Sequence, residues 1–336
     1  MKNAVLIIYT GGTIGMVQDE NGTLHPFALD RIYDVLPLLK KASYQIDSYQ
    51  LDPIIDSSNM NPSVWQNIAS VIEKEYDNYD GFLVLHGTDT MAYTASALSF
   101  AFENLSKPIV LTGSQLPLGM LRSDGRENII CALEIASARK MLIPEVCIFF
   151  ENKLYRGNRS TKVSAQNFNA FTSFNYPSLA VAGIDIYYKN DLIAPLPTAP
   201  MKVYKHFDEN IAVLHLFPGI TQRVVNSVLS IEGLKAVIIT TYGSGNAPTE
   251  DWFLEELENV VKKGVIVYDV TQCKSGSVNI GRYATSSDMG RIGVVSGYDI
   301  TIEAAVTKLM FLLGNYSDRN EITDLLTQSL RGEITL

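Results

Sequence analysis

The chain has 336 residues, of which 46% are hydrophobic and 19% charged, so it can bury a large core and is too long for one small domain. Its 36 acidic and 27 basic side chains give a formal net charge of −9, which repels polyanions and argues against a nucleic-acid partner. The three cysteines, Cys131, Cys147 and Cys273, have no paired spacing, so we expect neither disulfides nor a metal site. We also expect no cofactor.

The amino-terminal residues do not form a targeting or membrane segment. The apolar run from Ala4 to Ile8 is broken at once by Thr10-Gly11-Gly12, which leaves it too short for the core of a signal peptide. No segment approaches the roughly 20 apolar residues that a membrane helix needs. We therefore expect a cytoplasmic protein without a membrane partner.

Short runs of β-branched residues predict strands that are buried on both faces, as in parallel sheets. They cover residues 4–9, 81–86, 108–112, 145–150, 211–216, 236–241 and 264–270. Amphipathic segments predict helices at 62–76, 91–103, 221–230, 250–263, 302–313 and 321–330. Because strands and helices alternate, the sequence predicts an α/β fold with a mainly parallel sheet flanked by helices.

This alternation lapses once, between residues 185 and 209. Pro195, Pro197 and Pro200 lie there, and proline sustains neither a strand ladder nor a helix interior. We interpret 185–209 as a linker between a larger N-terminal α/β domain, 1–184, and a smaller C-terminal α/β domain, 210–336. The chain contains no internal repeat.

Hydroxyl groups follow two of the predicted strands at their carboxyl ends, where open α/β sheets bind ligands. Thr13 follows the first strand, and Thr88 and Asp89 follow the strand at 81–86. Structural roles are also open, because glycines after a strand make turns and Thr88 or Asp89 could cap the helix at 91–103. His86 ends an apolar strand, and we expect it to make a buried hydrogen bond rather than act as a base.

Two more polar segments have the chemistry to bind a small zwitterion. Asp56, Ser57 and Ser58 precede the helix at 62–76, and Ser114 follows the strand at 108–112. Hydroxyls and backbone N–H groups bind a carboxylate, while Asp56 or Asp89 can hold an ammonium group. Each segment alone could equally be an ordinary capped loop.

Lys162 is by default a solvated surface lysine. Beside a hydroxyl, a lysine kept partly neutral by burial can accept that hydroxyl's proton, and an adjacent carboxylate can orient it. Its importance therefore depends on its partners in the fold.

The two hydroxyl-rich strand ends together resemble the signature segments of the bacterial-type L-asparaginases, in the order and spacing of that family. The resemblance covers nearly the whole chain, through Thr10–Gly15, Asp56–Ser58, His86–Met91, Thr112–Ser114, Tyr155–Arg159 and Tyr242–Pro248. With Thr271-Gln272-Cys273 and no export signal, the chain is most similar to the cytoplasmic type I subgroup. The resemblance implies hydrolysis of L-asparagine to L-aspartate and ammonia, with the N-terminal domain as the catalytic one.

The resemblance also implies roles for individual residues. Thr13 would attack the side-chain amide and form a β-aspartyl ester, and Thr88, Asp89 and Lys162 would activate the group or the water that resolves it. Backbone N–H groups near Thr88 and Ser114 would stabilise the oxyanion. The implied substrate-binding residues are Asp56, Ser57, Ser58, Thr88, Asp89, Ser114 and Asn246. We expect a homodimer or homotetramer, in which Asn246 reaches a neighbour's site.

The chain departs from the family pattern on the loop after the nucleophile, where most members have a tyrosine and residues 19–26 have none. Either Thr23 and water suffice, or another phenol replaces it. Our hypothesis is Tyr283, from the same or a neighbouring subunit; a packed structural tyrosine is the alternative.

A second departure concerns the separate asparagine-binding effector site of some type I enzymes. The arginine of that site is Thr240 here, although Thr271, Gln272 and Cys273 are present. Without a bidentate partner for the effector carboxylate, we predict hyperbolic kinetics.

Competing interpretations are a non-catalytic amino-acid sensor, a glutaminase-asparaginase, or the amide-donating subunit of a tRNA-dependent amidotransferase. The last should carry a basic tRNA-contacting region, and the sequence shows none.

Overall fold

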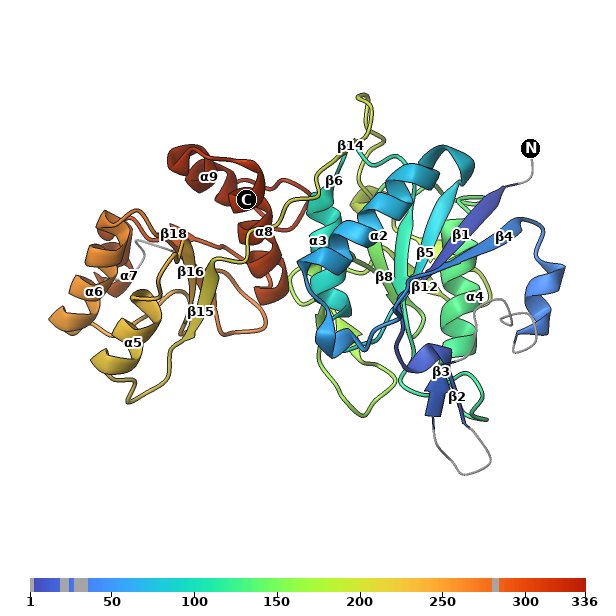
Figure 1. The fold of residues 1–336 in the computed structure, drawn as a ribbon, viewed down its shortest axis with the longest axis horizontal. Coiled ribbons are helices and arrows are strands. Elements are labelled where there is room, and N and C mark those ends of the chain that lie inside the picture. The colour runs from blue at the N-terminus through green and yellow to red at the C-terminus, as the bar shows by residue number, and fades with distance from the viewer. Residues whose placement is uncertain (1–2, 19–23, 27–35, 280–283) are drawn as a thin grey trace. The chain divides into compact units, whose positions relative to one another are not determined.

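A computed structural model describes residues 3–18, 24–26, 36–279 and 284–336 (Figure 1). The chain forms two compact units, Met1–Lys205 and His206–Leu336. Among the described residues, no helix is both long enough and apolar enough to span a membrane.

Unit 1 is built on an eight-stranded mixed sheet with the order β13-β12-β9-β8-β7-β5-β1-β4. The strands are β1 (Ala4–Tyr9), β4 (Gln45–Gln50), β5 (Gly81–Leu85), β7 (Ile109–Thr112), β8 (Val146–Phe150), β9 (Lys153–Arg156), β12 (Ala180–Ala182) and β13 (Ile186–Tyr188). The run from β4 to β8 is parallel, whereas β9, β12 and β13 pair antiparallel. The predicted parallel core is confirmed, and β4 and the three antiparallel strands are additions that the sequence did not indicate.

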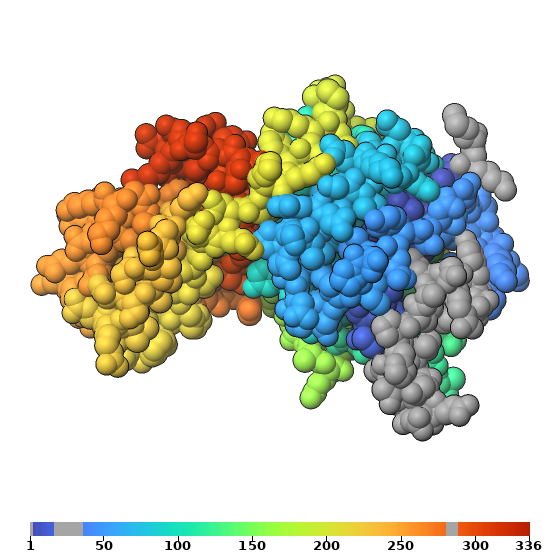
Figure 2. Space-filling view, in the orientation of Figure 1, coloured from blue at the N-terminus to red at the C-terminus, as the bar shows by residue number. Residues whose placement is uncertain are grey.

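Helices cover both faces of this sheet. They are α2 (Pro62–Glu75), α3 (Met91–Ala101) and α4 (Gly125–Ala136). Alternate residues of the parallel strands, such as Val5, Leu83 and Val110, form a core with α4 residues such as Leu133. Because side chains alternate along a strand, the other strand residues face the opposite side, where α3 packs on β7 and β8 and α2 packs on α3. In the space-filling view, light-blue segments, the colour of α2, form a large part of the visible face of unit 1 (Figure 2).

Short elements complete unit 1. The two-stranded pairs are β2 (Met16–Gln18) with β3 (Leu24–Pro26), β10 (Thr161–Lys162) with β11 (Phe171–Thr172), and β6 (Phe102–Glu103) with β14 (Lys202–Val203). The 3-10 turns are η1 (Thr13–Gly15), η3 (Pro37–Lys41), η4 (Ser57–Asn59), η5 (Tyr76–Asn78), η6 (Gly157–Arg159) and η7 (Asn190–Leu192). Within the range 185–209, β13 pairs with β12 and β14 pairs with β6, so parts of this stretch belong to unit 1.

Unit 2 is a smaller α/β unit with a four-stranded parallel sheet in the order β15-β16-β17-β18. The strands are β15 (Ile211–His215), β16 (Ala236–Thr241), β17 (Ile266–Thr271) and β18 (Val295–Ser296). The helices are α5 (Gln222–Leu229), α6 (Asp251–Lys262), α7 (Ala284–Ile292), α8 (Ile302–Asn315) and α9 (Arg319–Leu326). The expectation of burial on both faces is wrong for β15, because this edge strand leaves Val213 46% exposed.

Candidate active site

The site is built on one edge of the unit 1 sheet. Strands β1, β5 and β7 are parallel neighbours, and their register pairs Tyr9 with Leu85 and Leu85 with Thr112, so all three end at the same level. The segments that follow carry Thr13, Thr88 and Ser114. The topology therefore places three of the predicted polar segments on one rim.

Two glycines allow the first two of these segments to touch. A Cβ atom on Gly12 would lie 2.5 Å from the backbone N and Cα of Gly87, so the two backbones are in direct contact. Gly87 also packs on the fourth segment, because its own Cβ would lie 2.5 Å from the hydroxyl of Ser57. Thr13 and Thr88, both half-buried, directly follow the touching glycines.

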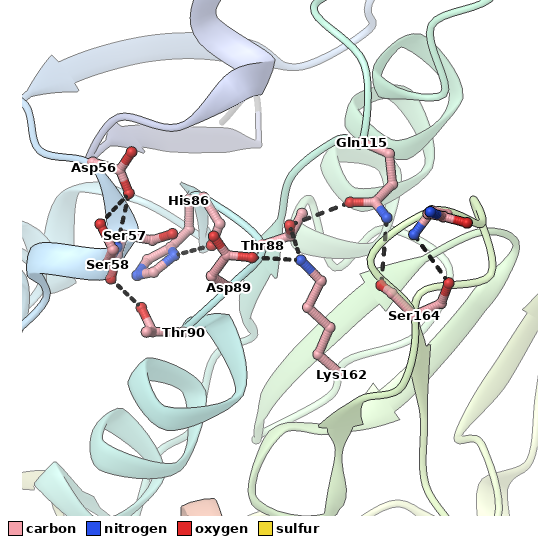
Figure 3. A network of polar contacts seen from close by, with 12 residues as sticks. Asp56, Ser57, Ser58, His86, Thr88, Asp89, Thr90, Gln115, Lys162 and Ser164 are labelled. Atoms are coloured by element: carbon pink, nitrogen blue, oxygen red, sulfur yellow. Dashed lines mark hydrogen bonds and ion pairs between the residues drawn. The ribbon is translucent and has the colours of Figure 1, made fainter.

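Lys162, at the end of β10, extends its side chain toward Thr88 and Asp89 on this rim (Figure 3). Its ammonium group donates to the hydroxyl of Thr88 and to the carboxylate of Asp89, each at 2.7 Å. The side chain of Lys162 is 17% exposed, whereas that of Asp89 is 66% exposed. Lys162 is thus no solvated surface lysine but the centre of a hydroxyl–ammonium–carboxylate cluster.

Thr88 and Asp89 do not cap the following helix. The N-cap position of α3 is Thr90, and no side chain makes a cap hydrogen bond there. The Thr90 hydroxyl instead donates to the carbonyl of Ser57 at 2.7 Å, which ties the two segments together. The capping alternative that the sequence left open is therefore wrong for these two residues.

His86 lies beneath the rim and is fully buried. Its Nδ1 donates to the carbonyl of Gly87 at 2.6 Å, so its Nε2 accepts from the Thr94 hydroxyl at 2.8 Å, which in turn accepts from Trp65. Burial lowers the pKa of His86 to about 4, so the ring is neutral at physiological pH. The expectation of a buried hydrogen-bonding histidine is confirmed.

Asp56 begins the fourth segment at the N-cap of η4. One carboxylate oxygen accepts from both the backbone N–H and the hydroxyl of Ser58 at 2.8 Å, and these two bonds lower the pKa of Asp56. The local capping role expected as the plainer alternative is therefore present. Asp56 is also exposed and ionised, so it can still bind a cation.

Gln115 is a site residue that the sequence did not single out. Its side-chain oxygen accepts from the Thr88 hydroxyl at 3.3 Å (Figure 3). Its amide donates to the carbonyl of Asn167 at 3.0 Å. The preceding residue, Ser114, is 2% exposed and donates its hydroxyl within its own turn to Leu116. Nothing in the run Gly113-Ser114-Gln115 distinguished Gln115 from Ser114, because only the fold turns the longer side chain toward Thr88.

The remaining predicted site residues lie in unit 2 or outside the described residues. In unit 2, Thr240 bonds His215 at 2.7 Å, Gln272 donates to the carbonyls of Leu216 and Thr240, and Thr271 bonds Gly243 and the Cys273 N–H. Asn246 closes a tight loop by pairing with Tyr242. Tyr283 and residues 19–23 lie outside the described residues. Within the described part, no three His, Cys, Asp or Glu side chains cluster in a way that could hold a metal ion.

Two family models match the chain. The model "Asparaginase, N-terminal" covers residues 4–194, and "Glutaminase/Asparaginase C-terminal domain" covers residues 210–326. The chain belongs to the asparaginase family. The resemblance predicted from the sequence segments is therefore confirmed.

Individual relatives agree with the family models. L-asparaginase 1 of Escherichia coli K12 is 45% identical, with 99% of this chain and 98% of that protein covered. The crystal structure of L-asparaginase I from Vibrio cholerae matches all of both chains with a TM-score of 0.92 and 42% identity. The mouse 60 kDa lysophospholipase is 42% identical, but this chain covers 63% of its length. The fold predicted from the sequence thus recurs in full-length relatives.

Proposed function

We propose that this protein hydrolyses the side-chain amide of L-asparagine, with the hydroxyl of Thr13 as nucleophile and a β-aspartyl ester as intermediate. Family membership and the L-asparaginase relatives support an amidohydrolase of this kind. The observation that carries the mechanism is the position of Lys162, 2.7 Å from both the Thr88 hydroxyl and the Asp89 carboxylate. A binding protein would have no use for a lysine poised on a threonine hydroxyl.

In the first step the Thr13 oxygen attacks the amide carbon, its proton passes to the leaving nitrogen, and ammonia departs. Backbone N–H groups near Thr88 and Ser114 stabilise the oxyanion of the tetrahedral intermediate, a contribution of about 3 kcal/mol for each such donor. The product of this step is an ester between Thr13 and the side chain of aspartate. Splitting one difficult hydrolysis into two acyl transfers lowers the barrier of each.

In the second step water resolves the ester. Lys162 in its neutral form accepts the Thr88 proton, Thr88 takes a proton from the water that attacks the ester carbon, and Asp89 stabilises the ammonium that forms on Lys162. As the bond between the ester carbon and the Thr13 oxygen breaks, a proton returns from Lys162 to that oxygen, so that aspartate leaves and both Thr13 and neutral Lys162 are restored. In the resting arrangement the ammonium donates to both partners. Neither step needs a metal ion or an organic cofactor.

The acidic side chains give the site its preference for an amino acid. Asp89 uses one oxygen for Lys162, and its other oxygen makes no hydrogen bond to a described residue, so it can bind the α-ammonium group. Asp56 supplies a second negative charge, and the Ser57 hydroxyl supplies a donor for the α-carboxylate; Ser58 can add its own donors only by releasing Asp56, to which its N–H and hydroxyl both donate. A simple amide lacks both charged groups and would bind poorly.

The test is release of ammonia from L-asparagine by the purified protein, with Thr13→Ala as the inactive control. We expect an aspartyl adduct on the peptide containing Thr13 when Lys162→Met enzyme is acid-quenched during turnover and analysed by mass spectrometry. Binding without ammonia release would support the sensor instead. The ratio of kcat/KM for asparagine and glutamine measures the choice between the two amides, because one methylene contributes only about 1 to 3 kcal/mol.

We also propose that the protein is cytoplasmic and that it forms a homodimer or homotetramer. Such an assembly would allow Asn246 of one subunit to contribute to the site of another. Light scattering measures the mass in solution, and Asn246→Ala tests the contribution to KM. A monomer with full activity would contradict this part.

A further inference from the structure

The turn that carries Gln115 is held by the first turn of α4. The carboxylate of Asp124 accepts from the backbone N–H of Gln115 at 3.0 and 3.1 Å and from that of Leu116 at 3.1 Å. One helical turn later, Asn128 donates to the carbonyl of Gly113 at 3.0 Å and to Asp124 at 3.3 Å. Asp124 and Asn128, at the start of one helix, therefore hold the turn by hydrogen bonds to the backbone of Gly113, Gln115 and Leu116.

Asp124 does not make the contacts that its position would ordinarily suggest. It stands at the N-cap of α4, where an aspartate usually accepts from the helix's own N–H groups, yet α4 has no side-chain cap bond. It forms no ion pair with any described residue. Its charge is instead satisfied by three donors on the turn and on Asn128, and hydrogen bonds to a carboxylate are about twice as strong as neutral ones.

The start of α4 is also packed tightly against the same turn. A Cβ atom on Gly125 would lie 3.0 Å from the Cβ of Ser114 and 3.3 Å from Ile14, the residue after Thr13. Asn128 is 2% exposed and accepts from the Glu151 N–H, so its orientation is fixed from the core side. The helix thus provides a rigid support for a surface turn at the catalytic rim.

Gln115 connects this turn to Thr88 through a hydrogen bond. The Thr88 oxygen is contacted from two sides, by the Lys162 ammonium at 2.7 Å and by the Gln115 carbonyl at 3.3 Å. The Gln115 side chain is itself held by Asn167. Movement of the turn would remove one of the two groups that fix the Thr88 side chain.

We propose that Asp124 is a positioning residue for the reaction: it holds the Gly113–Leu116 turn so that Gln115 and Lys162 together fix the hydroxyl of Thr88. This inference rests on the proposed function, because it assigns Thr88 a part in the chemistry. Asp124 itself touches no reacting atom. Its replacement should lower kcat and leave KM nearly unchanged, because Asp56 and Asp89 are not held by it.

The first experiment measures kcat and KM for L-asparagine in Asp124→Asn, with Glu127→Gln as matched control. Glu127 lies on the same turn of α4 and is exposed, so its replacement removes the same charge without touching the turn. We expect Asp124→Asn to lower kcat about 10- to 100-fold, the range expected for a displacement of catalytic groups by about 1 Å, with KM within about twofold. A folded Asp124→Asn enzyme with the kcat of Glu127→Gln would overturn the proposal.

The second experiment asks whether Asp124 acts through Gln115. Gln115→Leu alone should lower kcat. Adding Asp124→Asn should then lower kcat by no more than about another twofold, because the contact between Gln115 and Thr88, through which Asp124 acts, is already lost. Equal fold losses from Asp124→Asn in both backgrounds would mean an independent structural effect and would also overturn the proposal.

Two outcomes keep the inference separate from the proposed function. If wild-type protein releases no ammonia from asparagine, the proposed function fails, and with it the role of Thr88. If wild type is active, Thr13→Ala is inactive and Asp124→Asn matches its control, only the inference fails. Should Asp124→Asn not fold, Asp124→Glu keeps the charge but shifts the carboxylate by one methylene, and the same loss of kcat at unchanged KM is expected.

Discussion

Asp269 on β17 makes the stability of unit 2 dependent on pH. Its side chain is fully buried, and one carboxylate oxygen accepts from the Thr241 hydroxyl at 2.7 Å. The other oxygen has no hydrogen-bond partner among the described residues and lies beside Gly245, where a Cβ atom would be 3.3 Å from it. Burial raises the pKa of Asp269 from 3.8 to about 7, only partly opposed by the Thr241 bond.

The sign and size of the effect follow from this shift. Because the folded-state pKa lies above the unfolded one, the protonated carboxyl stabilises the fold fully below about pH 4, and this stability is lost as the pH rises through about 7. A shift of about three pKa units corresponds to about 4 kcal/mol as an upper value. Between about pH 5 and pH 8 the wild type should therefore lose about 2 to 3 kcal/mol relative to a chain that cannot ionise at this position.

The perturbation is Asp269→Asn, which keeps the shape and the acceptor for Thr241 but carries no charge. The amide nitrogen of the introduced Asn lacks an acceptor, which lowers the free energy of unfolding by about 1 to 3 kcal/mol at every pH. This loss leaves the dependence of the free energy of unfolding on pH unchanged. Urea unfolding of unit 2 is measured in both proteins at several pH values from about 5 to 9, which gives the difference between their free energies of unfolding at each pH. Asp251→Asn, an exposed change on α6, is the control, and its difference from wild type should not vary with pH. A difference for Asp269→Asn that is equally flat would refute the reasoning.

Three further predictions concern catalysis. Lys162→Met should lower kcat at least about 10³-fold in an ammonia-release assay without loss of thermal stability, and a loss under tenfold would remove Lys162 from the mechanism. Tyr283→Phe should lower kcat if its phenol replaces the missing loop tyrosine; unchanged kcat, with Thr13→Ala inactive, would leave Tyr283 a structural residue. Initial rates against asparagine concentration should be hyperbolic, because Thr240 bonds His215 and offers no bidentate partner for a carboxylate, and a Hill coefficient clearly above one would contradict this.

Most of the fold could be predicted because its signal is local. Buried parallel strands read as continuous apolar runs, and all seven predicted strands are present with ends that differ by at most two residues. The apolar spacing in α2, of which Ile68, Val71 and Ile72 are buried, identified a helix in the same way. Strands β9, β12 and β13 were missed because they are short and mix apolar residues with polar or exposed ones, such as Arg156 in β9 and Tyr187 in β13 at 72% exposed, so no continuous apolar run marks them.

The site residues fall into two groups, those that the sequence predicted and those that it missed, for a physical reason. Thr88, Asp89 and Ser114 follow parallel strands, so topology alone brings their segments to one edge of the sheet. Gln115 and Asp124 act through a turn and the start of a helix, and their contacts depend on how far α4 lies from β7. That distance is set by core packing, which leaves no pattern in the few residues concerned.

The glycines beside the two threonines show how such packing makes the site. In sequence Gly12 and Gly87 are compatible with ordinary turns, but their absent side chains are what let two strand ends meet at backbone contact. A methyl group at either position would lie about 2.5 Å from an atom of the neighbouring segment, closer than side chains tolerate, so the segments would separate. Thr13 directly follows Gly12, and Thr88, which Lys162 contacts, directly follows Gly87. The two glycines, which carry no chemistry, therefore hold together the segments that carry the two threonines.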